Sequence, residues 1–154
     1  MGSVTWRVTD LVAASPDAVW AWMIDFSADD HASEAFRRGA GVKGTPRDSL
    51  RTILSREGNV LEIEDRDGRS TYKQTVTLHP KARRVHIAGQ MGYDATWSAT
   101  PEAGGTRVTV EGRMGRGVMG SLMTLFGSAL RKSMERDFRG HLEDLRETLG
   151  LARA

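Results

Sequence analysis

The stretch VHIAGQMGYDATWSATPEAGGTRVTVEGRM, from Val85 to Met114, decides the fold. Apolar and polar residues alternate through it with a period of two, and turn residues at Gln90 to Gly92 and at Glu102 to Gly105 divide it into three segments. Such alternation predicts half-buried β-strands, and closely spaced turns predict antiparallel neighbours. A three-residue loop at the first turn is expected, because it places only Gly92 in the left-handed region. The stretch therefore predicts three consecutive antiparallel strands.

The same pattern extends toward the N-terminus. Further turn signals stand at Glu57-Gly58, at Asp67-Gly68 and at Pro80 to Arg83, separated by intervals typical of an antiparallel meander. We therefore expect six strands in succession between Leu50 and Met114.

Loop length determines which residues of neighbouring strands stand opposite one another, and a slip of one residue would turn every side chain over. The expected pairs are Leu54–Leu61, Thr52–Ile63, Ile63–Tyr72, Leu61–Gln74, Leu78–Val85, Val76–Ile87, Val85–Trp97, Ile87–Ala95, Gly89–Tyr93, Trp97–Val110 and Ala99–Val108. These residues make up one largely apolar face. The other face collects Glu62 opposite Lys73, Asp94 opposite Arg113, and several threonines, as a solvated face would.

Helices are expected on either side of the six strands. A strand from Trp6 to Val12 stops at Ser15-Pro16-Asp17, which has the cap, the first-turn proline and the acid of a helix start. A second short helix runs to about Arg38. After Gly117, apolar residues recur at three- and four-residue steps to about Leu149, which predicts one long helix. Its nearly uncharged first half is expected against the sheet, and its charged second half partly in solvent.

Composition narrows the class of protein. The chain has 154 residues, no cysteine and a formal net charge of +2, which predicts one domain over residues 1–154 without disulfides or thiolate metal sites. Charges of both signs alternate, which argues against a nucleic-acid partner. The longest nearly uncharged apolar run, Val118 to Leu130, is shorter than the roughly 20 residues of a membrane span. Without a signal-peptide pattern, a cytoplasmic protein with no cofactor is expected, and a weak homodimer stays open.

Three segments resemble those of a known family: Ala14 to Trp20 at the first helix, Thr96 to Pro101 in the penultimate strand and Gly105 to Val110 in the last. With the order β-αα-β6-α, the chain resembles the START-like (SRPBCC) superfamily and its polyketide cyclase/dehydrase and lipid-transport family. The resemblance implies an α+β helix-grip fold, in which a curved seven-stranded antiparallel sheet wraps around the long C-terminal helix. It also implies a cavity between them for an apolar small molecule.

The apolar face of the sheet has four polar exceptions, which are Thr52, Tyr72, Gln74 and Tyr93. Apolar walls with a few polar groups are typical of a ligand pocket, although they are equally compatible with a solid core. An unpaired buried amide costs roughly 1–3 kcal/mol, so a tyrosine hydroxyl, a water or a ligand oxygen should bond Gln74. The residues expected to bind a ligand are Tyr72, Gln74, Tyr93, Trp97, Val110, Met119, Met123 and Phe126.

Other motifs predict no further chemistry. Gly115 to Gly120 matches GxGxxG, but an antiparallel sheet precedes it and no strand follows its helix, which argues against a dinucleotide site. The four histidines lack metal-ligand spacing, and His86 is expected to face solvent. Acidic residues on the strands are expected on the outer face, so that only Tyr72 and Tyr93 are titratable groups inside the cavity.

These features predict binding or transport of a hydrophobic small molecule, lipid-like or polyketide-like. Two alternatives stay open. One is an enzyme of the cyclase/dehydratase kind, in which the tyrosines of the same cavity move protons. The other is an interaction module whose groove receives a partner's helix or a membrane surface.

Overall fold

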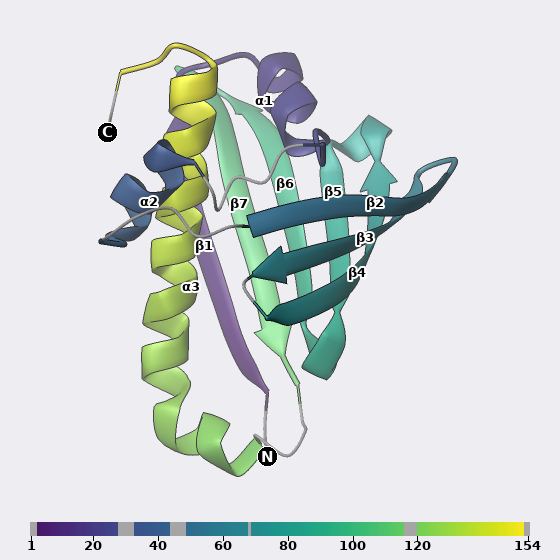
Figure 1. Cartoon of the computed structure of the whole chain (residues 1–154). Helices are drawn as coiled ribbons and strands as arrows, with labels where there is room; N and C mark the ends of the chain where they lie inside the picture. The colour runs from purple at the N-terminus through teal and green to yellow at the C-terminus, as the bar shows by residue number, and fades with distance from the viewer. Residues whose placement is uncertain (1–2, 28–32, 44–48, 68, 116–119, 153–154) are drawn as a thin grey trace.

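One curved sheet of seven antiparallel strands, ordered β1-β7-β6-β5-β4-β3-β2, forms the body of the fold (Figure 1). This computed structural model describes residues 3–27, 33–43, 49–67, 69–115 and 120–152, and at 49, 67, 91 and 120–126 only the backbone. The strands are β1 Val4–Val12, β2 Ser49–Glu57, β3 Val60–Asp67, β4 Ser70–His79, β5 Arg84–Gly89, β6 Asp94–Glu102 and β7 Gly105–Met114. The expected element order is confirmed.

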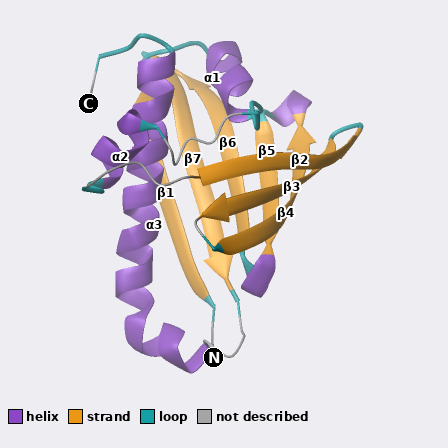
Figure 2. Ribbon diagram, viewed as in Figure 1, coloured by secondary structure: helices purple, strands orange, loops and turns teal. Residues whose placement is uncertain are grey.

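The helices described are α1 Pro16–Met23, α2 Glu34–Ala40 and α3 Gly120–Thr148, with short 3-10 turns η2 Pro80–Ala82 and η3 Gln90–Gly92. Ser15 caps α1 as expected, because its hydroxyl oxygen accepts a hydrogen bond from the backbone N–H of Ala18 at 3.1 Å. Figure 2 shows α3 running alongside β1, with α2 packed against it and α1 over one end of the sheet.

The registers from β4 to β7 are the expected ones. Val85 stands opposite Trp97, and Trp97 stands opposite Val110. The loop between β5 and β6 has the three residues of η3, with Gly92 at φ +70°. The concave face of this part of the sheet is therefore the apolar face that the sequence predicts.

The β2–β3 hairpin differs from the expected register. Its turn lies one residue later, at residues 58 and 59, because the glycine takes the first turn position with φ +59°. A bulge at Leu54 then brings Ile53 opposite Ile63. Thr52 and Leu54, expected on the inner face, are both exposed. One additional residue in a strand reverses the faces on the far side of the bulge.

The β3–β4 hairpin is shifted by two residues from the expected pairing. Gln74 stands opposite Ile63, where Tyr72 was expected. A shift by an even number of residues leaves every side chain on its expected face, since the period of a strand is two. The error therefore moves residues along the sheet without turning them over.

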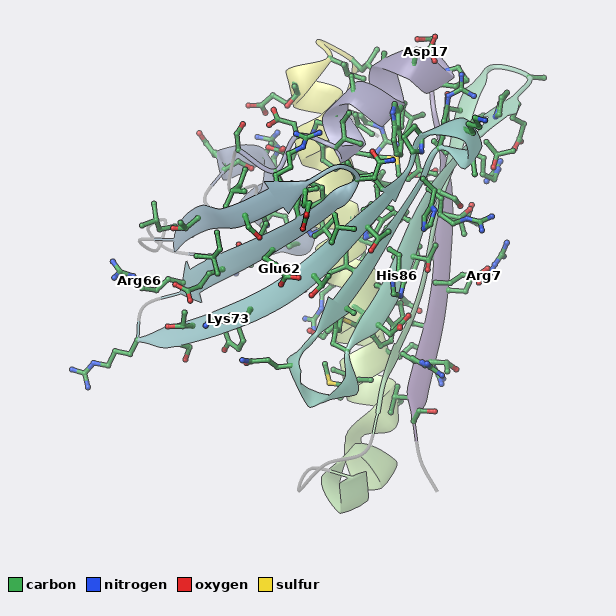
Figure 3. The ribbon with its side chains drawn as sticks, turned by 90° about the vertical axis from the view of Figure 1, so that its right-hand side faces the viewer. Arg7, Asp17, Glu62, Arg66, Lys73 and His86 are labelled. Atoms are coloured by element: carbon green, nitrogen blue, oxygen red, sulfur yellow. The ribbon has the colours of Figure 1, made fainter. Side chains whose placement is uncertain are left out.

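The convex face of the sheet is polar and charged. Glu62, expected opposite Lys73, stands opposite Thr75, whose hydroxyl donates hydrogen bonds to both Glu62 carboxylate oxygens at 2.9 and 3.0 Å. Asp94 stands opposite Arg113, as expected. The labelled side chains on this face in Figure 3 are Arg7, Glu62, Arg66, Lys73 and His86.

The core lies between the concave face and the C-terminal half of α3. Phe138, Leu142 and Leu145 on that half are at most 2% exposed. As expected, this charged half lies partly in solvent, since Arg131, Lys132 and Arg136 are exposed while the apolar stripe is buried. Charges on the flanks of a helix show which faces are wet, but they do not show which turns the sheet covers.

Candidate ligand-binding cavity

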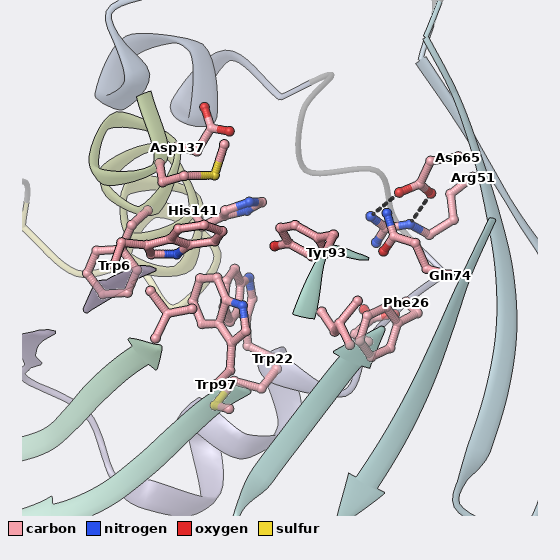
Figure 4. A pocket seen from close by; sticks show the side chains of 16 residues that line it. Trp6, Trp22, Phe26, Arg51, Asp65, Gln74, Tyr93, Trp97, Asp137 and His141 are labelled. Atoms are coloured by element: carbon pink, nitrogen blue, oxygen red, sulfur yellow. Dashed lines mark hydrogen bonds and ion pairs between the residues drawn. The ribbon is translucent and has the colours of Figure 1, made fainter. Parts of the chain in front are cut away.

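A cavity of about 240 Å³ lies between the concave face of the sheet and α3. Its deep wall is aromatic (Figure 4). The Trp97 ring centroid lies 5.5 Å from that of Phe138, 5.5 Å from that of His141 and 6.4 Å from that of Trp22. Such separations are typical of offset and edge-to-face ring pairs, which hold one another in place.

The helix α3 presents one stripe of side chains to this cavity. Met134, Asp137, Phe138 and His141 all line it, and they are separated by three- and four-residue steps. These steps place side chains on one face of a helix. The same stripe that supplies an apolar wall therefore brings a carboxylate and an imidazole to the space.

Opposite this wall, an ion pair joins β2 to β3. The Arg51 guanidinium donates to both carboxylate oxygens of Asp65, with Nε–Oδ1 2.7 Å and Nη2–Oδ2 3.2 Å. The guanidinium carbon also lies 5.6 Å from the centroid of the Phe26 ring, within the range of a cation–π contact. All three side chains line the cavity.

Two polar side chains between these walls have no partner among the residues that the structure describes. Within the described part of the chain, neither the Tyr93 hydroxyl nor the Gln74 amide makes a hydrogen bond, and both residues line the cavity. Burial raises the pKa of Tyr93 to about 12, and the nearby carboxylates of Asp137 and Asp94 add to the rise. The phenol therefore keeps its proton at neutral pH and can donate a hydrogen bond.

Half of the eight residues predicted to bind a ligand line the cavity. Those that line the cavity are Gln74, Tyr93, Trp97 and Val110. Tyr72 does not line it and is 45% exposed, because the two-residue shift places it opposite Asp65, nearer the end of the hairpin. Met119 lies outside the described residues, and the side chains of Met123 and Phe126 are not described.

Five polar or charged lining residues were missed: Asp25, Arg51, Asp65, Asp137 and His141. The expectation that strand acids face outward was wrong for Asp65, and alternation from Ile63, two residues earlier, was a signal for it. Arg51 had no such signal, because the bulge reverses its face. Asp137 and His141 flank Phe138 at helical spacing, which was a usable signal.

The other sequence motifs lie outside this cavity or outside the described residues. His86 stands between Thr77 and Thr96 on neighbouring strands, as expected, and its Nε2 lies 3.0 Å from Asp94 Oδ2. Residues 116–119 of the GxGxxG match lie outside the described residues. Among the residues described, no three histidine or acidic side chains are grouped to hold a metal ion. No described helix is both long and apolar enough to cross a membrane.

A curved antiparallel sheet that grips a long C-terminal helix defines the helix-grip fold of START-like proteins. The chain belongs to the polyketide cyclase/dehydrase and lipid transport family, whose model matches residues 3–150. A search of curated proteins gave no match.

Solved structures of low sequence identity share this fold. The Zhui aromatase/cyclase from Streptomyces sp. R1128 is 17% identical, with a TM-score of 0.60, and the match covers 96% of this chain and 92% of that one. A START superfamily protein from Mycobacterium smegmatis is 16% identical, with a TM-score of 0.55 and coverage of 94% and 99%. The di-domain ARO/CYC StfQ from the steffimycin biosynthetic pathway is 13% identical, with a TM-score of 0.68 and coverage of 97% and 53%.

Proposed function

We propose that this protein binds or carries a small hydrophobic molecule that contains an aromatic ring. The observation that carries the proposal is the cavity itself, whose aromatic wall faces two polar groups, Tyr93 and Gln74, that have no partner in the described part of the protein. Pockets for small molecules have this make-up, with apolar walls and few polar groups. A solid core would leave no space beside Tyr93 and Gln74.

The volume of the cavity supports a ligand of one or two fused rings. An engineered apolar cavity of about 150 Å³ accepts benzene. The cavity here has a volume of about 240 Å³, and the difference leaves space for roughly one further ring. Offset stacking on Trp97 and Phe138 favours a planar guest over a flexible chain.

Tyr93 and Gln74 would orient the polar end of the ligand. The Tyr93 phenol is a hydrogen-bond donor at neutral pH, since its pKa is raised to about 12. The Gln74 amide can both donate and accept. A carbonyl or hydroxyl group on the ligand would satisfy both side chains, while Trp97 and Val110 would surround its apolar body.

The expected affinity is moderate. Burying about 300 Å² of ligand surface at roughly 25 cal/mol per Å² gives near 7 kcal/mol, and lost rigid-body freedom removes part of this. A dissociation constant around the micromolar range is expected for a ligand held mainly by apolar contact.

Native mass spectrometry after incubation with a lipid and natural-product extract tests this proposal. The wild-type protein should retain a small apolar compound, and the Val110→Phe variant, whose new ring takes up part of the cavity, should retain much less. Equal retention by both proteins, or recovery of a protein partner without any small molecule, would contradict the proposal.

A second candidate function is catalysis of the cyclase/dehydratase type. It is favoured by Asp137 and His141 on α3, which line the same space as Tyr93 on the sheet side. A base and a proton donor on opposite sides of a ligand are what proton transfer during ring closure and dehydration requires.

A synthetic poly-β-ketone thioester tests the catalytic candidate, with the aromatic product followed by its absorbance. If the protein catalyses ring closure, Tyr93→Phe and Asp137→Asn should lower the rate by roughly 10²–10⁴-fold while changing substrate binding far less. Product formation at the same rate in the variants, or at the uncatalysed rate in the wild type, would reject this candidate.

A further inference from the structure

The two polar ends of the cavity differ in charge balance. At the β2–β3 end, the Asp65 carboxylate is neutralised by Arg51 through two hydrogen bonds. At the α3 end, the Asp137 carboxylate has no hydrogen bond or ion pair within the described part of the chain. In Figure 4 the Tyr93 hydroxyl is directed toward the side of the cavity where Asp137 and His141 lie.

The described lining residues as a group are negatively charged. Three carboxylates, of Asp25, Asp65 and Asp137, face one guanidinium, of Arg51, so the formal charge is −2 with a neutral imidazole. Charge repulsion inside a partly enclosed space is screened less than at an open surface. A carboxylate or phosphate on the ligand is therefore disfavoured, and a positive charge is favoured.

The rings beside Asp137 add to this preference. Trp97 contacts Phe138 and His141, and the Trp6 ring centroid lies 6.0 Å from that of Tyr93. Faces of tryptophan and tyrosine rings attract a cation through their quadrupole. Carboxylate and rings together match an ammonium group attached to an aromatic body.

From this arrangement we propose that the cavity selects an aromatic amine, whose ammonium group is held by Asp137 and whose rings pack against the aromatic wall. The inference rests on the proposed function, since it names the class of ligand for the same cavity. The contribution of Asp137 to the raised pKa of Tyr93 is consistent with a carboxylate close to the phenol.

Three probes of nearly equal shape test the proposal by isothermal titration calorimetry at pH 7 and low salt: naphthalen-1-ylmethylamine, naphthalen-1-ylmethanol and 1-naphthoate. The ammonium probe should bind about tenfold more tightly than the neutral alcohol, and the carboxylate about tenfold more weakly. The Asp137→Asn variant should lose this preference and bind the ammonium and alcohol probes with equal affinity.

Glu135→Gln is the matched control. It removes the same charge from the same helix, about 160° away around its axis, at a residue that does not line the cavity. This variant should keep the tenfold preference. Equal loss in both variants, or equal binding of amine and alcohol by the wild type, would overturn the assignment to Asp137.

The outcomes separate this inference from the proposed function. If the alcohol binds but the amine has no advantage, the cavity is a ligand site and only the charge preference is wrong. If none of the three probes binds, the proposed function fails together with the inference that rests on it.

Discussion

Arg51 on β2 and Asp65 on β3 stand directly opposite each other and form a two-point ion pair in the wall of the cavity. Their side chains are only 10% and 22% exposed. Since β2 is one of the two edge strands of the sheet, this pair helps to hold that edge in place beside the cavity.

Removing the acid of this pair should destabilise the protein measurably. Asp65→Asn leaves a largely buried guanidinium with a weaker partner, and a loss of about 2 kcal/mol in the free energy of unfolding is expected. Urea unfolding measures it. Glu111→Gln, which breaks the exposed Arg7–Glu111 pair between β1 and β7, should cost less than about 1 kcal/mol. Equal losses in the two variants would show that the burial of the first pair does not matter.

A methyl group at Gly112 should disturb the cavity wall. The new Cβ would overlap the Trp6 indole, which lies across this glycine of β7 and lines the cavity. Gly112→Ala should therefore lower the free energy of unfolding by about 1–3 kcal/mol. Gly127→Ala is the comparison, because among the described atoms its Cβ would meet Val4 alone, at 3.5 Å, and a helix gains up to about 1 kcal/mol from this change. Thermal unfolding should move in opposite directions for the two variants.

The Tyr93 phenol should titrate at about pH 12. The chain has two tyrosines, so absorbance of tyrosinate in a Tyr72→Phe variant reports on Tyr93 alone. Folding raises the pKa above its usual value near 10, so the associated stability is complete below pH 10 and is lost as the pH rises through about 12. Relative to Tyr93→Phe, the wild type should lose up to about 3 kcal/mol between these values. A midpoint near pH 10 in the folded protein would contradict the burial of this phenol.

A larger side chain beside the cavity should lower the free energy of unfolding less than the same change in the packed core. Val110 lines the cavity, whereas Val108, two residues earlier on the same face of β7, is 0% exposed and does not. Val110→Leu should change the free energy of unfolding by less than about 1 kcal/mol, and Val108→Leu should lower it by about 1–3 kcal/mol. Chemical denaturation measures both. Similar costs would mean that the space beside Val110 is already filled.

The sheet was predictable because its signals are local. Alternation and turn residues between Val85 and Met114 determine the strands, the three-residue loop before Tyr93 and the inner face that carries Trp97 and Val110. The β2–β3 and β3–β4 hairpins had a wrong register. Each has a glycine next to polar residues, so that the two-residue turn can begin either at the glycine or one residue before it.

The candidate site was predictable only in part. Gln74 and Tyr93 follow from alternation, but Arg51 depends on a bulge at Leu54 that no local pattern marks. Asp137 and His141 depend on which turns of α3 the sheet covers, and that is decided by packing between distant segments.

The order of strands and helices, the polar and apolar faces of the sheet outside β2, and the resemblance to the polyketide cyclase/dehydrase and lipid transport family came from the sequence alone. The elements and the faces were predictable because each rests on neighbours within a few residues. The empty volume, the Arg51–Asp65 pair and an Asp137 carboxylate that has no partner among the described residues required the assembled molecule. Whether space remains between a sheet and a helix depends on how closely the whole set of side chains interlocks, and no short segment carries that information.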